Sequence, residues 1–274
     1  MLEKLQYKNH MNEVLDFGSG KLYVNENDLR DFAWEVASKN NRISGFDKGI
    51  VTKTIPIIMK VDTVEEGLQL RNKLFEVFEK DVLTVKHGKI IIGDYYLKCF
   101  VTESVKSSYL IHKGYMRIDA KVTTDFPYWQ KETTTAFNYG GAKVVGKNLD
   151  YNRDFPSDYT SNLIGTSLIN SNFVASNFRM NIYGACENPV ITIAGHNYGV
   201  NVSIAANEYL TIDSVNKTII KTLADGRTEN CFNLRDRSSY IFEKIPAGTQ
   251  NVSANAGFKF DVVLLEERSE PKWI

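Results

Sequence analysis

Histidine and cysteine are the residue types of this chain that could most directly bind a metal ion or act in catalysis. The 274 residues contain four histidines and three cysteines: His10, His87, His112, His196, Cys99, Cys186 and Cys231. Zinc sites are recognised by pairs at short spacing, such as HxxxH or CxxC, and no two of these residues form such a pair. The spacing therefore predicts no metal site. The odd, sparse cysteine count favours a reducing cytoplasm over a disulfide framework.

Motifs for phosphate binding and nucleophilic catalysis are incomplete. Gly18-Ser19-Gly20-Lys21 contains part of a phosphate loop. A P-loop, however, needs GxxxxGK[ST] between a strand and a helix, and strand-like residues 22–24 follow here. A hairpin turn is the better interpretation. The sequence also contains no GxSxG segment, which would indicate a nucleophile elbow.

The acidic residues are poorly spaced for chemistry. Asp150, Asp154 and Asp158 lack the DxDxDG spacing of a calcium loop and are interpreted as solvated loop residues. The adjacent glutamates at 65–66 and at 266–267 would point to different sides of a helix or strand, so their spacing does not bring an acid and a base together. The sequence thus predicts no catalytic residues, no cofactor and no enzymatic activity.

The overall composition excludes some further classes. Lys+Arg and Asp+Glu each total 33, which gives a formal net charge of zero. A nucleic-acid-binding protein would usually have a basic excess, whereas a chain without net charge repels its own copies weakly. We find no apolar run near the roughly 18 residues that span a membrane and no apolar signal segment at the N-terminus. We expect a protein made in a bacterial cytoplasm, without membrane contact.

One amphipathic helix is predicted over 64–80. Thr63 is the expected N-cap, and Glu66 would reach back to its amide as in a capping box. Four apolar residues recur with the spacing of a single helical face: Leu70, Leu74, Val77 and Phe78. A weaker pattern over 29–37 also favours a helix.

The remaining N-terminal segments favour strands. They are predicted at 55–61, 82–85, 89–92, 95–101 and 116–122. The last of these alternates apolar and charged residues, as half-buried strands do. His87-Gly88 is interpreted as a tight turn between two of them. Pro56, which has no N–H to donate, is expected at a sheet edge or at the start of a strand.

A change in composition near residue 131 predicts a domain boundary, with domains at 1–130 and 131–274. After a polar stretch over 131–171, short strands recur at regular intervals: 178–183, 190–194, 200–204, 209–212, 218–223, 230–234, 239–242 and 258–266. Asp225-Gly226 indicates a hairpin turn of type I′ between two of them. This density of strands favours an antiparallel β-sandwich.

The order of these features resembles a known family. Its members show similar segments in this order: 116–122 running into Asp125-Phe126-Pro127-Tyr128-Trp129, then 188–193, 208–213, Ile245-Pro246-Ala247-Gly248 and a chain that stops soon after 266–268. The chain is therefore similar, over nearly its whole length, to the phage distal tail protein family. Phe46 stands where many members carry an arginine, so any role of that arginine is not carried over.

The resemblance implies a mainly β, two-domain subunit of a bacteriophage tail. The N-terminal domain would be a β-barrel or sandwich-like belt domain that closes into a hexameric ring, and the C-terminal domain a galectin-like antiparallel β-sandwich. The ring would join the tail tube protein to a baseplate or fibre protein at the virion tail tip. The resemblance implies no catalytic residues, and it implies no nucleic-acid contact beyond the tail channel.

Two other functions remain open at this point. The C-terminal sandwich could be a carbohydrate-binding module that contacts the host cell wall, which would require exposed aromatic rings beside polar groups. A tail tube subunit would share part of the β architecture, but the helix after residue 61 and the additional C-terminal sandwich disfavour it.

Overall fold

The computed structural model describes residues 4–18, 20–24, 26–110, 115–138 and 167–273. The chain divides into two compact units, which we call unit 1 (1–131 with 267–274) and unit 2 (132–266). Residues 267–274 thus belong to unit 1, although the composition placed them in the C-terminal domain. His112, Asp150, Asp154 and Asp158 lie outside the described residues. Among the described residues, no helix has the length and hydrophobicity needed to cross a membrane.

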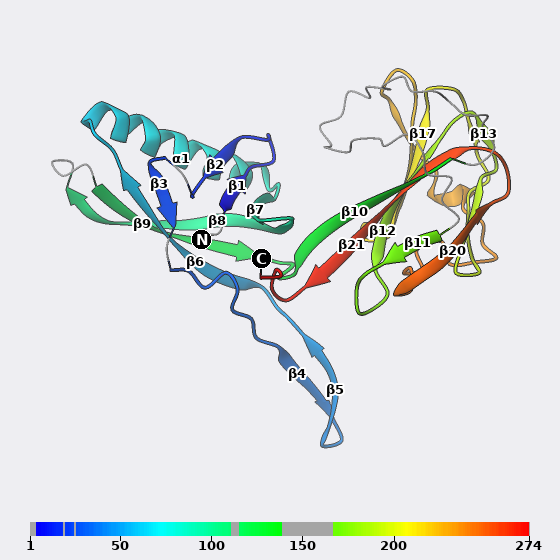
Figure 1. Ribbon diagram of the computed structural model, residues 1–274, viewed down its shortest axis with the longest axis horizontal. Coiled ribbons are helices and arrows are strands. Elements are labelled where there is room, and N and C mark those ends of the chain that lie inside the picture. Colours follow the sequence, from blue (N-terminus) through cyan, green and yellow to red (C-terminus); the bar gives the residue numbers. More distant parts are fainter. Residues whose placement is uncertain (1–3, 19, 25, 111–114, 139–166, 274) are drawn as a thin grey trace. The chain divides into compact units, whose positions relative to one another are not determined.

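Unit 1 is built from two antiparallel sheets that share one long strand (Figure 1). The shared strand is β8 (Tyr95–Leu110), whose first half pairs with β7 and whose second half pairs with β9. The first sheet has the order β2-β1-β7-β8, and the second has the order β3-β6-β9-β8. The other strands are β1 (Leu5–Lys8), β2 (Val14–Asp16), β3 (Leu22–Val24), β6 (Val51–Lys60), β7 (Gly88–Ile92) and β9 (Tyr115–Thr124). A single core of apolar side chains lies between the sheets and the helix.

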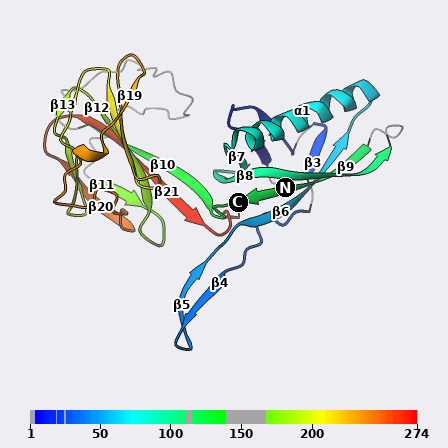
Figure 2. The ribbon, with the colours of Figure 1, turned by 180° about the vertical axis from the view of Figure 1, so that it is seen from behind.

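The helix of unit 1, α1 (Val64–Thr84), packs against β8 (Figures 1 and 2). The Thr63 hydroxyl accepts a hydrogen bond from the Glu66 N–H, so Thr63 caps the helix. The Glu66 carboxylate differs from the expected capping box, because it accepts from the Asp62 N–H at 3.4 Å instead of from Thr63. It also forms an ion pair with Lys21. Three of the four expected face residues are buried, and Leu70 packs partly buried against the same core: Leu70, Leu74, Val77 and Phe78.

Replacing Leu74 with alanine is expected to lower the free energy of unfolding by about 2–5 kcal/mol, because the side chain fills the core between α1 and the sheets. Denaturant titration would measure the loss. Leu83, on the same helix but 74% exposed, provides the control, and its replacement by alanine should change stability by less than about 0.5 kcal/mol. Equal effects at both positions would contradict this packing.

Three local predictions in unit 1 are wrong. The helix expected over 29–37 is instead an extended segment that leads into β4 (Glu35–Lys39). The strand expected over 82–85 is the end of α1 and its left-handed cap, Val85. No hairpin therefore forms at His87-Gly88, which connects the helix to β7. The expectation for Pro56 agrees with the structure. It lies within β6 but at a sheet edge, because β9 pairs with it on one side and β3, on the other side, pairs only with residues 57–59.

Unit 2 is a sandwich of two antiparallel sheets around one core. One sheet contains β12 (Asn177–Tyr183), β17 (Tyr209–Asp213), β18 (Thr218–Thr222), β19 (Thr228–Asn230) and β21 (Lys259–Arg268), the last of which continues into unit 1. The other has the order β11 (Ser167–Asn170), β20 (Gly248–Ala254), β14 (Val190–Ile193) and β15 (His196–Gly199). Alternate residues of both sheets, such as Met180 and Ile182 facing Ile191 and Ile193, form the core. β10 (Trp129–Asn138) begins in unit 1, and β13 (Cys186–Glu187) pairs with β16 (Ser203–Ile204).

Some local predictions for unit 2 also need correction. The hairpin at Asp225-Gly226 joins β18 and β19, but only Gly226 has a positive φ (+86°), so the turn is not of type I′. Residues 232–234 form a short 3-10 helix and residues 239–242 form no strand. β11 and β20, which pair with each other, were not expected. The chain is mainly β, as the alternation predicts.

Candidate assembly surface

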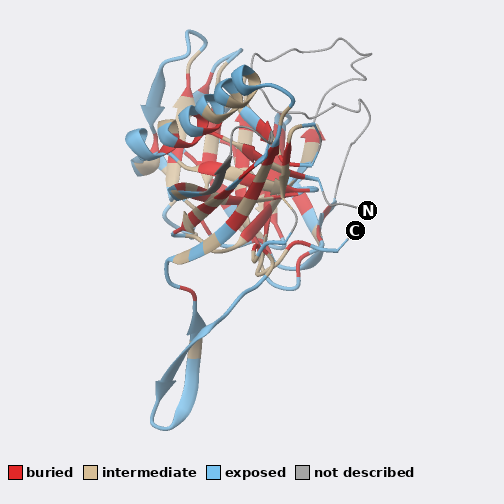
Figure 3. Ribbon diagram, turned by 90° about the vertical axis from the view of Figure 1, so that its left-hand side faces the viewer, coloured by how far each residue is buried: buried red, intermediate tan, exposed pale blue. Residues whose placement is uncertain are grey.

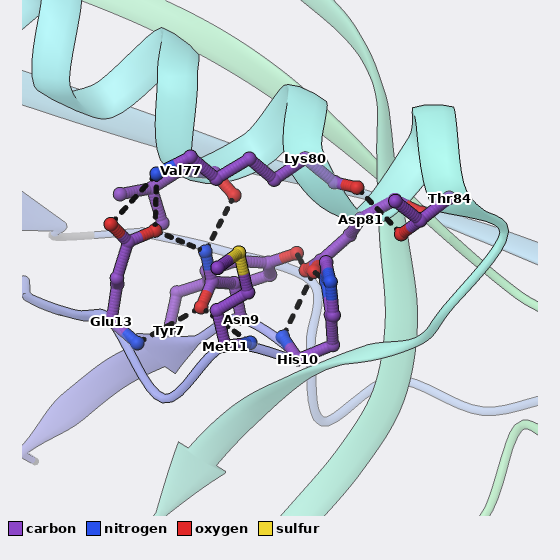
Figure 4. Close-up of polar contacts among 9 residues, drawn as sticks. All are labelled: Tyr7, Asn9, His10, Met11, Glu13, Val77, Lys80, Asp81 and Thr84. Atoms are coloured by element: carbon purple, nitrogen blue, oxygen red, sulfur yellow. Dashed lines mark hydrogen bonds and ion pairs between the residues drawn. The ribbon is translucent and has the colours of Figure 1, made fainter.

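The strongest candidate for chemistry in unit 1 is a buried polar cluster between β1 and the end of α1 (Figure 4). Asp81 is fully buried. Its carboxylate accepts a hydrogen bond from the Tyr7 hydroxyl at 2.5 Å and one from the backbone N–H of His10 at 2.9 Å. His10 Nδ1 lies 2.5 Å from the same carboxylate. Burial, followed by the electrostatic influence of Cys99 and the hydrogen bond to Asp81, raises the pKa of Tyr7 well above its usual range.

This cluster holds the fold together. A Cβ on Gly88 would lie 2.2 Å from the Asp81 carboxylate and 2.3 Å from the Tyr7 hydroxyl, so the groups fill the space around them. Asn9 and the Glu13–Lys80 ion pair continue the contacts between the β1–β2 turn and α1. The cluster therefore fixes the helix to the first hairpin and leaves no room for a substrate beside Gly88.

The other histidines have ordinary partners. His87 Nε2 lies 2.8 Å from Asp125 Oδ1, and His196 Nε2 lies 2.9 Å from the backbone oxygen of Tyr240. Among the described residues, no three His, Cys, Asp or Glu side chains are close enough to share a metal ion. The three cysteines are all free thiols, and the pKa of each is raised by burial.

A different kind of site is visible on the outside of unit 1. β4 and β5 (Arg42–Asp47) form a two-stranded hairpin that projects from the body of the unit, and we call it the arm. Figure 3 shows that the arm is exposed over almost its whole length. Isolated two-stranded hairpins are marginally stable in water. Such an arm is expected to be stabilised by a surface that it contacts.

One face of the arm is apolar. Val36 pairs with Phe46, and the Trp34 ring lies edge-on to the Phe46 ring at 6.3 Å. A shift in register between Ala37 and Ser38 inserts one extra residue into β5, which returns Ile43 to the face of Phe46. All four apolar side chains are more than 40% exposed: Trp34, Val36, Ile43 and Phe46. A contiguous exposed apolar face of this kind usually marks a binding surface.

Lys48 anchors the base of the arm. Its ammonium lies 4.4 Å from the centre of the Trp34 ring and 4.7 Å from that of Tyr128, and it donates to the Ser269 hydroxyl at 2.8 Å. The Phe32 ring lies slightly farther away, at 5.3 Å. Only 8% of Lys48 is exposed, so these rings replace much of the water around its charge. This cage connects the base of the arm to Tyr128 and Ser269 in the body of unit 1.

Burial and the nearby Lys53 ammonium lower the pKa of Lys48 to about 8, from 10.5. Between these two pH values the unfolded chain binds a proton that the folded chain has released, so the free energy of unfolding should rise with pH. The rise should be at most about 3 kcal/mol. Chemical denaturation from pH 7 to 10.5 should show a rise in the wild type that Lys48→Met lacks. Lys39→Met, at the exposed arm tip, should keep the rise in unfolding free energy. Parallel pH profiles for all three chains would contradict the assignment of the rise to Lys48.

The comparisons with known proteins concern the fold. No protein-family model matches the sequence, and no curated protein matches it. Among solved structures, a chain of the phage P2 baseplate in its activated conformation with calcium is similar, with a TM-score of 0.64 and 13% identity over 99% of this chain and 100% of that one. The strontium form gives 0.60 at the same identity and the same coverage. The Dit protein of phage SPP1, described as a hub of the adsorption apparatus in phages that infect Gram-positive bacteria, gives 0.59 at 10% identity, over 97% of this chain and 99% of that one.

The similarity covers both units. The resemblance to the distal tail protein family, suggested by the order of sequence segments, is confirmed at the level of the fold. This chain has the fold of phage baseplate and Dit hub proteins.

Proposed function

We propose that this chain is a structural subunit of a phage or prophage tail tip, which assembles into a ring between the tail tube protein and a baseplate or fibre protein. The observation that carries the proposal is the apolar face of the arm, which none of the described residues of unit 1 covers. The similarity in fold to baseplate and hub proteins supports it. The role is one of assembly and requires no catalysis.

Ring formation needs two different patches on each subunit, because a patch that binds only itself produces a closed pair. The arm provides one such patch. Among the described residues, β4 and β5 pair only with each other, so their outer edges can also accept a strand from a neighbour. Unit 1, which contains the whole of the expected domain 1–130, is the proposed ring-forming part. Unit 2 would be the galectin-like sandwich that projects outward.

The number of subunits in the ring is proposed to be six, as in the family that the sequence resembles. The full chain should be measured by native mass spectrometry at high concentration, alone and with its tail tube and baseplate neighbours. We expect a six-fold species in at least one of these conditions, and negative-stain images of a ring. A chain that remains a monomer in all of them would refute the proposal. Mass spectrometry of purified virions should locate the protein in the tail.

Binding of cell-wall carbohydrate is the alternative, and one observation favours it. Tyr240 is 55% exposed on unit 2, and the Lys217 ammonium lies 5.6 Å from the centre of its ring. An exposed ring beside a polar donor is the arrangement that a sugar-binding face requires. Binding of purified host cell-wall polysaccharide to the full chain should then fall at least about tenfold in Tyr240→Ala. If the wild type does not bind, the alternative is excluded for that polymer.

A further inference from the structure

One flank of α1 carries a second apolar stripe, separate from the face that it buries; we call it the outer stripe. Its residues are Val64, Leu68, Phe75 and Val82, and each is between 39% and 51% exposed. At about 100° per residue, all four project within roughly 20° of Phe75 on the helix circumference. The buried face, centred near Leu74 and Asp81, lies about a quarter turn away or slightly more. Helix surfaces toward solvent are usually polar, and none of the described residues of unit 1 buries this stripe.

Charge distinguishes the stripe from the arm. Glu65, Glu76 and Glu79 are exposed on one margin of the stripe, and the half-buried Arg71 lies on the opposite margin. The tip of the arm, in contrast, is basic, because Lys39 and Arg42 pair at the end of the hairpin. Opposite charges beside two uncovered apolar surfaces select a partner and fix its register.

We propose that the apolar face of the arm binds the outer stripe of α1 on a neighbouring copy of the same chain. This inference rests on the proposed ring and names the surface that receives the arm. The arm points away from the sheet that carries α1, so it does not reach its own helix (Figures 1 and 2). The contact joins two different patches, as closure of a ring requires.

The apolar face of the arm is shorter than the stripe. From Val64 to Val82 the helix rises about 27 Å. The arm from Trp34 to Lys39 extends about 17 Å. The apolar face of the arm therefore fits along the stripe, with its basic tip beside the glutamates.

Site-directed cross-linking of the full chain tests the contact. One population carries Ser38→Cys, on the apolar face of the arm, and a second carries Asn72→Cys, beside the stripe. Both have Cys186 replaced by serine, since the other two native cysteines are buried. Mixing the populations with a short bismaleimide should produce a cross-linked dimer that neither population forms alone. The control replaces Asn72→Cys with Lys73→Cys, which is also exposed but projects about 100° farther round the helix.

We expect at least about tenfold more dimer with Asn72→Cys than with Lys73→Cys. Equal yields, or no dimer from a chain whose wild type forms oligomers, would overturn the docking on α1 and leave the proposed ring intact. A wild type that never self-associates, even with its tail neighbours, would instead remove the ring and this inference together.

A charge exchange gives an independent check. Lys39→Glu with Arg42→Glu at the arm tip, or Glu76→Lys with Glu79→Lys on the helix, should each reduce the dimer about tenfold. Combining the four changes in one chain should restore it to within about threefold of the wild type. Failure of the combined chain to recover, while its circular dichroism spectrum and unfolding midpoint match those of the wild type, would contradict the pairing.

Discussion

Replacing Val36 and Phe46 together with serine is expected to abolish self-association of the full chain with little effect on its folding. The two side chains face each other on the apolar side of the arm and are 56% and 59% exposed. Truncating a central apolar contact residue costs about 2 kcal/mol in binding, so two such changes should weaken association about a thousandfold. Their exposure keeps the expected change in unfolding free energy below roughly 0.5 kcal/mol each. Sedimentation equilibrium and denaturant titration would measure the two effects.

A matched control lies on the other side of the same strand. Glu35 and Ala37 alternate with Val36 along β4, so serine at both positions changes the polar face and spares the apolar one. This variant should associate as the wild type does. If both double variants weaken association equally, the arm acts through its backbone edges and not through its apolar face. If neither does, the arm is not part of the contact.

The second large effect is expected at the polar cluster under α1. Replacing Asp81 with alanine removes the acceptor for Tyr7 and His10 in a site without water access, which should cost about 3–5 kcal/mol of unfolding free energy. Such a loss approaches the whole stability of a small domain. Thermal and denaturant unfolding of the full chain would show the transition of unit 1 shifted or split from that of unit 2.

A double-mutant cycle separates this cluster from general damage. Tyr7→Phe removes only the hydroxyl, and its effect should largely vanish in the Asp81→Ala background, with a coupling energy of about 1–3 kcal/mol. Glu13→Gln breaks the nearby ion pair with Lys80, which is exposed to solvent, and should cost less than about 1 kcal/mol. Additive effects of Tyr7→Phe and Asp81→Ala would mean that the hydroxyl contributes no stability through Asp81.

Both ends of α1 show how far local sequence information extends. The start follows from Thr63 and the apolar spacing, which act within about two turns, and it was predictable. The end was not, because the β-branched and apolar residues at 82–85 favour a strand when considered alone. The helix continues through them since Asp81 is held by Tyr7 and His10, which lie more than 70 residues earlier. Only the folded chain brings these groups together.

The arm shows the same limit for the candidate site. The apolar residues over 29–37 are spaced in a way that also fits a helix. Residues 35–39 form a hairpin instead, because they pair with residues 42–47. Hydrophobicity can be read from a sequence, but exposure cannot, because it depends on which other segments cover a residue. In the sequence, Phe46 differs from its neighbours only in departing from the family pattern. The bulge that aligns Ile43 with it, and the cage around Lys48, exist only in the tertiary structure.

The sequence by itself therefore determined the mainly β character, the capped helix and the order of segments that resembles distal tail proteins, because alternation, capping and turn residues act locally. The tertiary structure decided the assignment of residues 267–274 to unit 1, the buried cluster at Asp81 and the two uncovered apolar surfaces. These depend on pairings between residues distant in sequence, which no local pattern encodes.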